Sequence, residues 1–128
     1  LLAVARVTIV ARDIEKALEL LGARAGAALD LRASLPAADL VFNATSLGMV
    51  GQPPLDTDLA SLPASALVFD AVYAPLETGL LRRARARGLQ TIDGLEMLVG
   101  QAAAAFELFF GQPAPRQHDA ELRAVLTR

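Results

Sequence analysis

The sequence predicts an α/β fold in which helices cover both faces of a parallel β-sheet. Short segments rich in β-forming residues alternate with segments of helical periodicity, which is the pattern of βαβ units. Residues 67–72 are apolar on both faces of the expected strand, as in the interior of a parallel sheet. With 128 residues, of which 54% are hydrophobic, the chain suits one domain with a real core but not two full domains.

The first half of the chain carries a clear helix between strands. Apolar residues recur at helical spacing over Ile14–Leu21, so one face of that segment is apolar. Asp13 suits the N-cap of the helix and Gly22 its end. The strands predicted in this half are residues 6–11, 27–32 (a weak one) and 39–44.

The second half predicts two more strands and three helices. Thr78 is expected to cap a helix that runs to about Arg87. Gly94 precedes a longer helix, which Gly111 and Pro113 end. Asp119 opens a last amphipathic helix. The strands predicted in this half are residues 67–72 and 90–93.

The composition excludes several classes of function. The chain has no cysteine, which removes disulfides and thiolate chemistry and fits a reducing, cytoplasmic location. Its single histidine, His118, has no second histidine to complete a metal site. A net charge of −2 gives no sign of a nucleic-acid partner, and no apolar stretch reaches the roughly 20 residues that span a bilayer.

Polar segments follow the predicted strands at the points where those strands end. Residues 11–16, 43–48 and 70–78 lie at such ends, and residues 94–101 open the helix after the last strand. In an open parallel sheet, ligands bind at the carboxyl ends of the strands. The four segments together predict a nucleotide site at that edge.

Three of these segments resemble those of the shikimate dehydrogenase family. Residues 43–49 read Asn-Ala-Thr-Ser-Leu-Gly-Met and resemble the family's Asn-Ala-Thr-Ser loop. The matching positions of the next two segments are Asp70, Tyr73, Pro75, Thr78, Leu80 and Leu81, and Gly94, Met97, Leu98, Gln101 and Ala102. The resemblance covers residues 6–112 in order, and it implies a Rossmann-like, partial dinucleotide-binding domain over residues 1–112.

The resemblance implies NADP as the cofactor. Arg12 and Lys16 match by charge the positions that bind the adenosine 2′-phosphate in the family, whereas Ala11 and Asp13 depart from the family pattern. A carboxylate at this point is typical of NAD binding, because it accepts a hydrogen bond from the free 2′-hydroxyl. Asp13 therefore has two interpretations, a helix N-cap or a ribose contact. Two cations against one carboxylate favour NADP.

The remaining cofactor and substrate positions follow from the same resemblance. Those near the nicotinamide are Asn43, Ala44, Thr45, Ser46, Ala71, Gly94 and Met97. Gly94 would allow the cofactor a close approach because it has no Cβ. Tyr73 and Gln101 match the substrate-contacting positions, where a phenol and an amide suit a polyhydroxylated acid.

Two expected parts of the family architecture have no counterpart in the sequence. The glycine-rich phosphate loop and the strand before it are missing, and that strand belongs between those at residues 6–11 and 39–44. We therefore expect upstream residues to exist. The family's catalytic lysine and aspartate belong to a substrate domain that is also missing, so no residue is assigned as general acid or base. Residues 113–128 are expected to form a linker and a helix that packs toward that domain.

The expected function is the reversible reduction of 3-dehydroshikimate to shikimate with NADPH, a step of aromatic amino-acid biosynthesis. The full-length protein is expected to be a monomer or a homodimer. One alternative is an NAD-dependent quinate/shikimate dehydrogenase, which Asp13 prompts. Another is a Rossmann-like binding module without catalysis. The missing glycine-rich loop favours this alternative, whereas the presence of Tyr73 and Gln101 argues against it.

Overall fold

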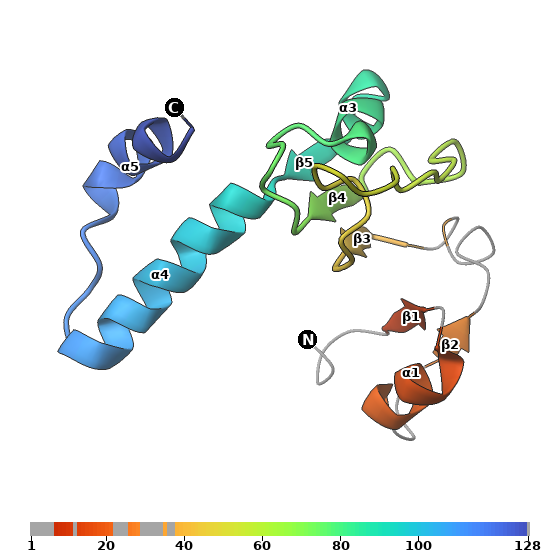
Figure 1. Ribbon diagram of the computed structural model, residues 1–128, viewed down its shortest axis with the longest axis horizontal. Helices are drawn as coiled ribbons and strands as arrows, with labels where there is room; N and C mark the ends of the chain where they lie inside the picture. Colours follow the sequence, from red (N-terminus) through yellow and green to blue (C-terminus); the bar gives the residue numbers. More distant parts are fainter. Residues whose placement is uncertain (1–6, 12, 22–25, 29–34, 36–37, 128) are drawn as a thin grey trace. The chain divides into compact units, whose positions relative to one another are not determined.

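The structure is a computed structural model that describes residues 7–11, 13–21, 26–28, 35 and 38–127 (Figure 1). It divides into two compact units, which are described separately. The first unit comprises Leu1–Asp39 and Thr57–Pro63, and the second comprises Leu40–Asp56 and Ala64–Arg128. Three of the four candidate segments belong to the second unit.

The described part of the first unit contains two short parallel strands and a helix. β1 (Thr8–Val10) pairs in parallel with β2 (Gly26–Ala28), and α1 (Ile14–Leu21) lies between them in the chain. The buried apolar residues of this unit include Ala17, Leu35, Leu59 and Leu62. The predicted first strand and first helix are confirmed. The weak strand predicted at residues 27–32 begins one residue earlier, and its last four positions lie outside the described residues.

A three-stranded parallel sheet forms the centre of the second unit. The order is β3 (Leu40–Asn43), β4 (Leu67–Asp70), β5 (Gln90–Ile92). The three predicted strands are confirmed, but each ends one or two residues earlier than predicted. Just after β3 and β4, backbone N–H groups donate hydrogen bonds to side-chain oxygens instead of to a neighbouring strand. The N–H of Thr45 donates to the Asn43 side chain at 3.0 Å, and that of Val72 donates to the Asp70 side chain at 3.1 Å.

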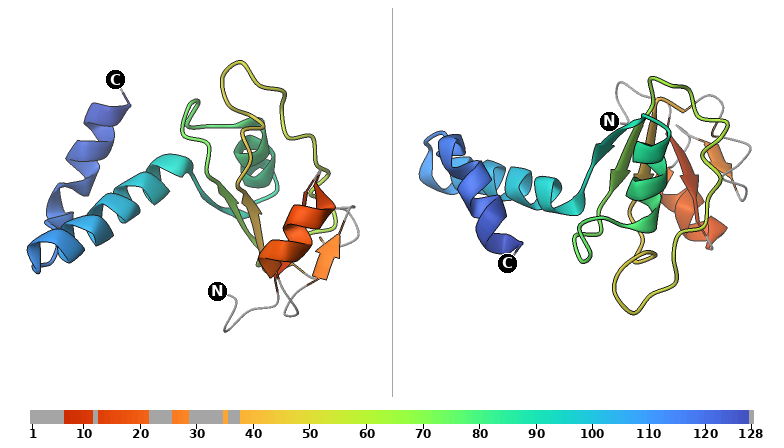
Figure 2. Two further views of the ribbon diagram at one scale, coloured as in Figure 1. Left: turned by 60° about the horizontal axis from the view of Figure 1, so that its bottom comes forward. Right: turned by 90° about the horizontal axis from the view of Figure 1, so that it is seen from above.

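One face of this sheet is covered by α3 (Gly79–Ala86), which packs against β4 and β5 (Figure 2). Thr78 is the N-cap, as predicted, and Arg87 is the C-cap. On the strands, buried Val41 alternates with Leu40 and Phe42, which are 42% and 48% exposed. In the described part of the second unit, β3 is therefore buried on one face and open on the other.

After β5 the chain forms two helices that run beside each other. α4 (Gly94–Phe110) starts at the end of β5 and stops at Gly111, whose φ of 64° lies in the left-handed region that glycine favours. A 3₁₀ turn, η3 (Arg116–His118), leads into α5 (Asp119–Leu126). α5 runs back along α4 (Figures 1 and 2). Among the described residues, no helix is long and apolar enough to cross a membrane.

Each unit has its own parallel sheet, β1-β2 in the first and β3-β4-β5 in the second. Within the described residues, no strand pairs with both β1 and β3.

Candidate functional site

Three candidate segments of the second unit leave the same edge of one sheet. Residues 43–48, 70–78 and 94–101 follow β3, β4 and β5, which are neighbouring and parallel. The carboxyl ends of parallel strands meet at one edge, where α/β proteins bind their ligands. The structure therefore brings these three segments together, as the sequence predicted.

The buried carboxylate of Asp70 connects two of these segments. Its side chain is fully buried and accepts hydrogen bonds from the side-chain amide of Asn43 at 2.9 Å, from the hydroxyl of Thr78 at 2.6 Å and from the N–H of Val72 at 3.1 Å. A buried carboxylate is costly unless hydrogen bonds compensate for lost water. Three donors supply that compensation, so the end of β4 is fixed to the end of β3 and to the start of α3.

Asn43 also organises the loop that follows β3. Its side-chain oxygen accepts from the N–H and the hydroxyl of Thr45 at 3.0 and 2.7 Å, and its amide donates to the carbonyl of Leu47 at 3.1 Å. Asn43 is buried, whereas Ala44, Thr45 and Ser46 are exposed. Of the four positions in this loop that are expected to contact the cofactor, Asn43 thus shapes the loop, and the other three lie on its exposed surface.

Gly94 lies directly against the segment after β4. A Cβ at Gly94 would lie 2.3 Å from the carbonyl oxygen of Ala71 and 2.6 Å from the carbonyl carbon of Val72, far inside any real contact. The first residue of α4 must therefore be glycine for the helix to start at this place. The resemblance explained Gly94 by a close approach of the cofactor, and the structure adds a packing reason within the protein itself.

The two expected substrate residues are exposed on this part of the second unit. Tyr73 is 55% exposed, and Gln101 lies on the exposed surface of α4, one turn beyond half-buried Met97. Neither the phenol nor the amide has a hydrogen-bond partner among the described residues. Both groups are therefore available to a ligand.

The fourth candidate segment belongs to the first unit and includes Asp13 and Lys16. The Asp13 side chain accepts from the N–H of Lys16 at 3.1 Å, and the carbonyl of Asp13 accepts from the N–H of Ala17 at 3.2 Å. Asp13 thus caps α1, as predicted. Its carboxylate also lies 3.6 Å from the Lys16 ammonium, with both side chains exposed. Ala11 is half-buried, and Arg12 lies outside the described residues.

An ion pair that the sequence did not predict lies at the start of α4. Arg123 of α5 donates two hydrogen bonds to the carboxylate of Asp93, one of them at 3.1 Å. Asp93 is the N-cap of α4 and also accepts from the N–H of Glu96 at 2.9 Å. The Asp-Gly pair at the helix start signals the cap, but nothing in the sequence pairs Asp93 with a residue 30 positions later.

The environment of Asp93 favours its charged form. Burial acts to raise the pKa of Asp93, but the hydrogen bond from Arg123, the N–H of Glu96 and the charge of Arg123 outweigh it. The pKa of Asp93 is therefore lowered, and the hydrogen bond to Asp93 raises the pKa of Arg123. The two groups form a charged pair at neutral pH.

The described residues contain no group of three or more acidic or histidine side chains that could hold a metal ion. What the site offers is a set of neutral donors and acceptors on exposed loops, backed by a rigid, buried hydrogen-bond network. Such a set can bind and orient a polar ligand.

A family model described as the Shikimate 5'-dehydrogenase C-terminal domain matches residues 94–121 of the chain. The chain is also 57% identical over 125 residues to the shikimate dehydrogenase (NADP(+)) of Sphingopyxis alaskensis, covering 96% of this chain and 46% of that protein. The chain spans about half the length of the curated relatives that it matches.

Solved structures agree with this match. The quinate dehydrogenase of Corynebacterium glutamicum in complex with NAD is 32% identical, with a TM-score of 0.79, over 91% of this chain and 45% of that one. The shikimate 5-dehydrogenase of Thermus thermophilus in complex with NADP(H) and shikimate is 34% identical, with a TM-score of 0.74, over 93% and 45% of the two chains. Both similarities cover most of the present chain.

Proposed function

This chain belongs to the shikimate dehydrogenase family, and from that premise we propose that it is the cofactor-binding half of an NADP-dependent enzyme that interconverts shikimate and 3-dehydroshikimate. This reaction serves aromatic amino-acid biosynthesis in the cytoplasm, and the absence of cysteine is compatible with that compartment.

The observation that carries the proposal is the arrangement of the three segments at one edge of the β3-β4-β5 sheet. Asp70 fixes the segment after β4 to Asn43 at the end of β3, and Gly94 brings the start of α4 against Ala71. Thr45, Ser46, Tyr73 and Gln101 are among the residues that this arrangement leaves exposed. The family resemblance assigns these four to the cofactor or the substrate.

The residues present fit the nicotinamide end of the cofactor. Exposed Thr45 and Ser46 offer hydroxyls, and half-buried Met97 offers an apolar contact. The bound cofactor would supply hydride transfer. This chain would bind and orient it through the residues proposed above, namely Asn43, Ala44, Thr45, Ser46, Ala71, Gly94 and Met97. At the adenosine end, Ala11, Arg12, Asp13 and Lys16 are the proposed contacts.

Tyr73 and Gln101 are proposed to bind the substrate. Shikimate carries hydroxyl groups and a carboxylate, and a phenol and an amide can form hydrogen bonds with hydroxyls. The proton that accompanies hydride transfer is proposed to be handled by residues outside this chain. We propose residues 1–112 as the partial cofactor domain, and residues 113–128 as a linker and helix that pack toward the substrate domain.

A chimera tests this function. In it, this chain replaces the matching part of the Sphingopyxis alaskensis relative, so that the other half of that protein completes the enzyme. We expect shikimate oxidation that depends on NADP⁺, measured by the NADPH formed. Gln101→Ala in the chimera is the control that should impair use of shikimate. A folded chimera that binds neither NADPH nor shikimate would refute the proposal.

Asp13 supports one alternative, an enzyme that prefers NAD. Its exposed carboxylate follows the strand after which a free ribose hydroxyl is commonly bound, and the similar quinate dehydrogenase of Corynebacterium glutamicum is in complex with NAD. In the chimera, a kcat/KM at least as high with NAD⁺ as with NADP⁺ would favour this alternative. Arg12 and Lys16 favour NADP instead, because two cations oppose one carboxylate.

A further inference from the structure

The first turn of α4 carries residues of the proposed site, and Asp93 begins it. Asp93 has an extended backbone conformation, and its side chain accepts from the N–H of Glu96 as an N-cap. The next residue, Gly94, is fixed against the backbone of Ala71 and Val72. Met97 and Gln101 follow on the same helix. The direction of the first turn therefore sets where these proposed contacts lie.

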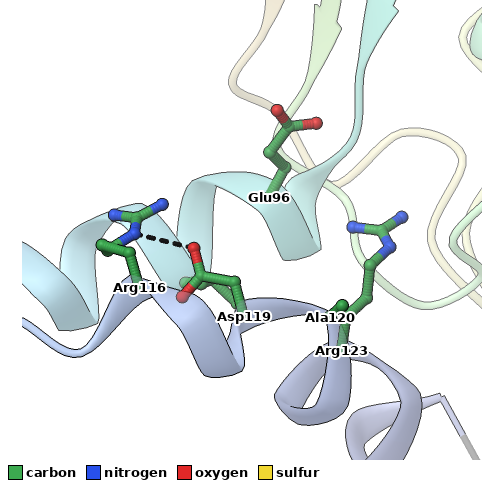
Figure 3. A pocket seen from close by; sticks show the side chains of 6 residues that line it. Glu96, Arg116, Asp119, Ala120 and Arg123 are labelled. Carbon is green, nitrogen blue, oxygen red and sulfur yellow. Dashed lines mark hydrogen bonds and ion pairs between the residues drawn. The ribbon is translucent and has the colours of Figure 1, made fainter.

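Arg123, which belongs to helix α5, stabilises this turn by pairing with Asp93. Its guanidinium donates through both terminal nitrogens to the two carboxylate oxygens of Asp93, and the Asp93 side chain is only 7% exposed. Figure 3 shows Arg123 extending from α5 toward the start of α4, whereas Arg116 is paired with Asp119 within its own segment. A two-point contact of this kind fixes orientation as well as distance.

The pocket beside this pair is not itself a ligand site. Its volume is about 270 Å³, and Glu96, Val99, Arg116, Asp119, Ala120 and Arg123 line it. Small-molecule pockets are roughly 300–1,000 Å³ and mostly apolar, whereas four of these six residues are charged. Arg116 already forms a salt bridge with Asp119, and Arg123 already forms one with Asp93. The arginine therefore acts on the protein and not on a ligand.

We propose that Arg123 is a positioning residue for the reaction: by pairing with Asp93 it fixes the first turn of α4 and, with it, the cofactor contact at Gly94 and the substrate contact at Gln101. This inference rests on the proposed function. It gives the C-terminal helix α5, which no proposed ligand contact involves, a direct influence on the site. Without Arg123, the Asp93 carboxylate would keep only its backbone donors, and water would enter beside the cap.

The test compares three variants of the chimera at a temperature where all are folded. Arg123→Ala removes both donors, Arg123→Lys restores a cation without the planar two-point geometry, and Arg116→Ala removes a nearby arginine paired elsewhere. We expect Arg123→Ala to raise the KM for shikimate and for NADP⁺ by about tenfold, since displacement of contact residues by a remote change has effects of this size. Arg123→Lys should recover part of this loss, and Arg116→Ala should match the wild type.

A second measurement separates this inference from the proposed function. Amide hydrogen exchange at Glu96 and Met97, which lie in the first turn of α4 and donate to Asp93, should be faster in Arg123→Ala and unchanged in Arg116→Ala. If the unmodified chimera does not oxidise shikimate, the proposed function fails, and exchange still reports whether Arg123 fixes the turn. Wild-type KM values in an active Arg123→Ala chimera, or unchanged exchange at these amides, would overturn the inference.

Discussion

The side-chain amide of Asn43 donates a 2.9 Å hydrogen bond to the buried carboxylate of Asp70 and so joins the ends of two neighbouring strands. Both residues lie at the same level of the sheet, because Asn43 is the register partner of Asp70. Each also bonds to its own following loop. The two loops proposed to contact the cofactor and the substrate therefore form one connected structure.

Asn43→Ala should weaken both stability and cofactor binding. The substitution removes the amide that donates to the buried Asp70 carboxylate and the oxygen that accepts two hydrogen bonds from Thr45. This loss should lower the free energy of unfolding by about 1–3 kcal/mol. Urea unfolding of the chimera and the KM for NADP⁺ measure the two effects. Ser46→Ala, on the exposed part of the same loop, is the control and should change stability by less than about 0.5 kcal/mol. Equal unfolding midpoints for both variants would contradict the role of Asn43.

Gly94→Ala should destabilise the protein and lower its activity. The added Cβ would overlap the Ala71 carbonyl, and relief of such overlap by backbone shifts costs about 1–3 kcal/mol. Gly100 provides a matched control on the same helix, because a Cβ there would meet nothing within 4 Å. Gly100→Ala should stabilise the protein by about 0.5–1 kcal/mol through helix propensity. Thermal unfolding of both variants measures this difference, and a harmless Gly94→Ala would show that the helix start can move.

Tyr73→Phe and Gln101→Ala should each raise the KM for shikimate and spare that for NADP⁺. Both side chains are exposed and have no hydrogen-bond partner among the described residues, so stability should change by less than about 0.5 kcal/mol. Loss of one hydrogen bond to an uncharged hydroxyl corresponds to about 0.5–1.5 kcal/mol. Steady-state kinetics of the chimera with each substrate varied gives the answer. Unchanged shikimate kinetics would remove the residue concerned from the site.

Asp13→Asn separates the two roles considered for Asp13. Asparagine caps a helix about as well as aspartate, so the stability of α1 should be preserved. Loss of the carboxylate should improve NADPH binding relative to NADH, because it removes a charge that repels the 2′-phosphate and that pairs with Lys16. Titration of both cofactors into the variant measures the ratio of their Kd values. A ratio equal to the wild type's would leave Asp13 with its capping role alone.

The Asp93–Arg123 pair should contribute to stability in a pH-dependent way. The pKa of Asp93 is lowered in the folded protein, so the contribution is present above the pKa of the unfolded chain, about 4, and is lost as the pH falls through the lower folded value. The difference in unfolding midpoint between the wild type and Arg123→Ala should therefore be constant from about pH 7 to about pH 5 and narrow below about pH 4. A difference that does not narrow in acid would show that Arg123 stabilises the fold by packing alone.

Local signals in the sequence determined the elements and the edge on which the site lies. Apolar periodicity predicted α1, β-rich runs predicted β3 and β4, and Thr78, Asp13 and Gly111 marked helix ends that the structure confirms. These signals are sufficient because caps and periodicity act within a few residues of the chain. The order of the motifs along the chain also carried the family assignment.

Only the tertiary structure decided how the segments are joined. Asn43 and Asp70 are 27 residues apart, and Asp93 and Arg123 are 30 residues apart, so no local pattern pairs them. Position 94 must be glycine because a Cβ there would overlap the carbonyl of Ala71, which belongs to a different segment of the chain. No spacing in the sequence could show this steric requirement. Hydrogen bonds and steric exclusion between distant residues depend on the packing of whole elements. The sequence thus names the residues of the proposed site, and the packing of β3, β4 and α4 fixes the geometry of those in the second unit.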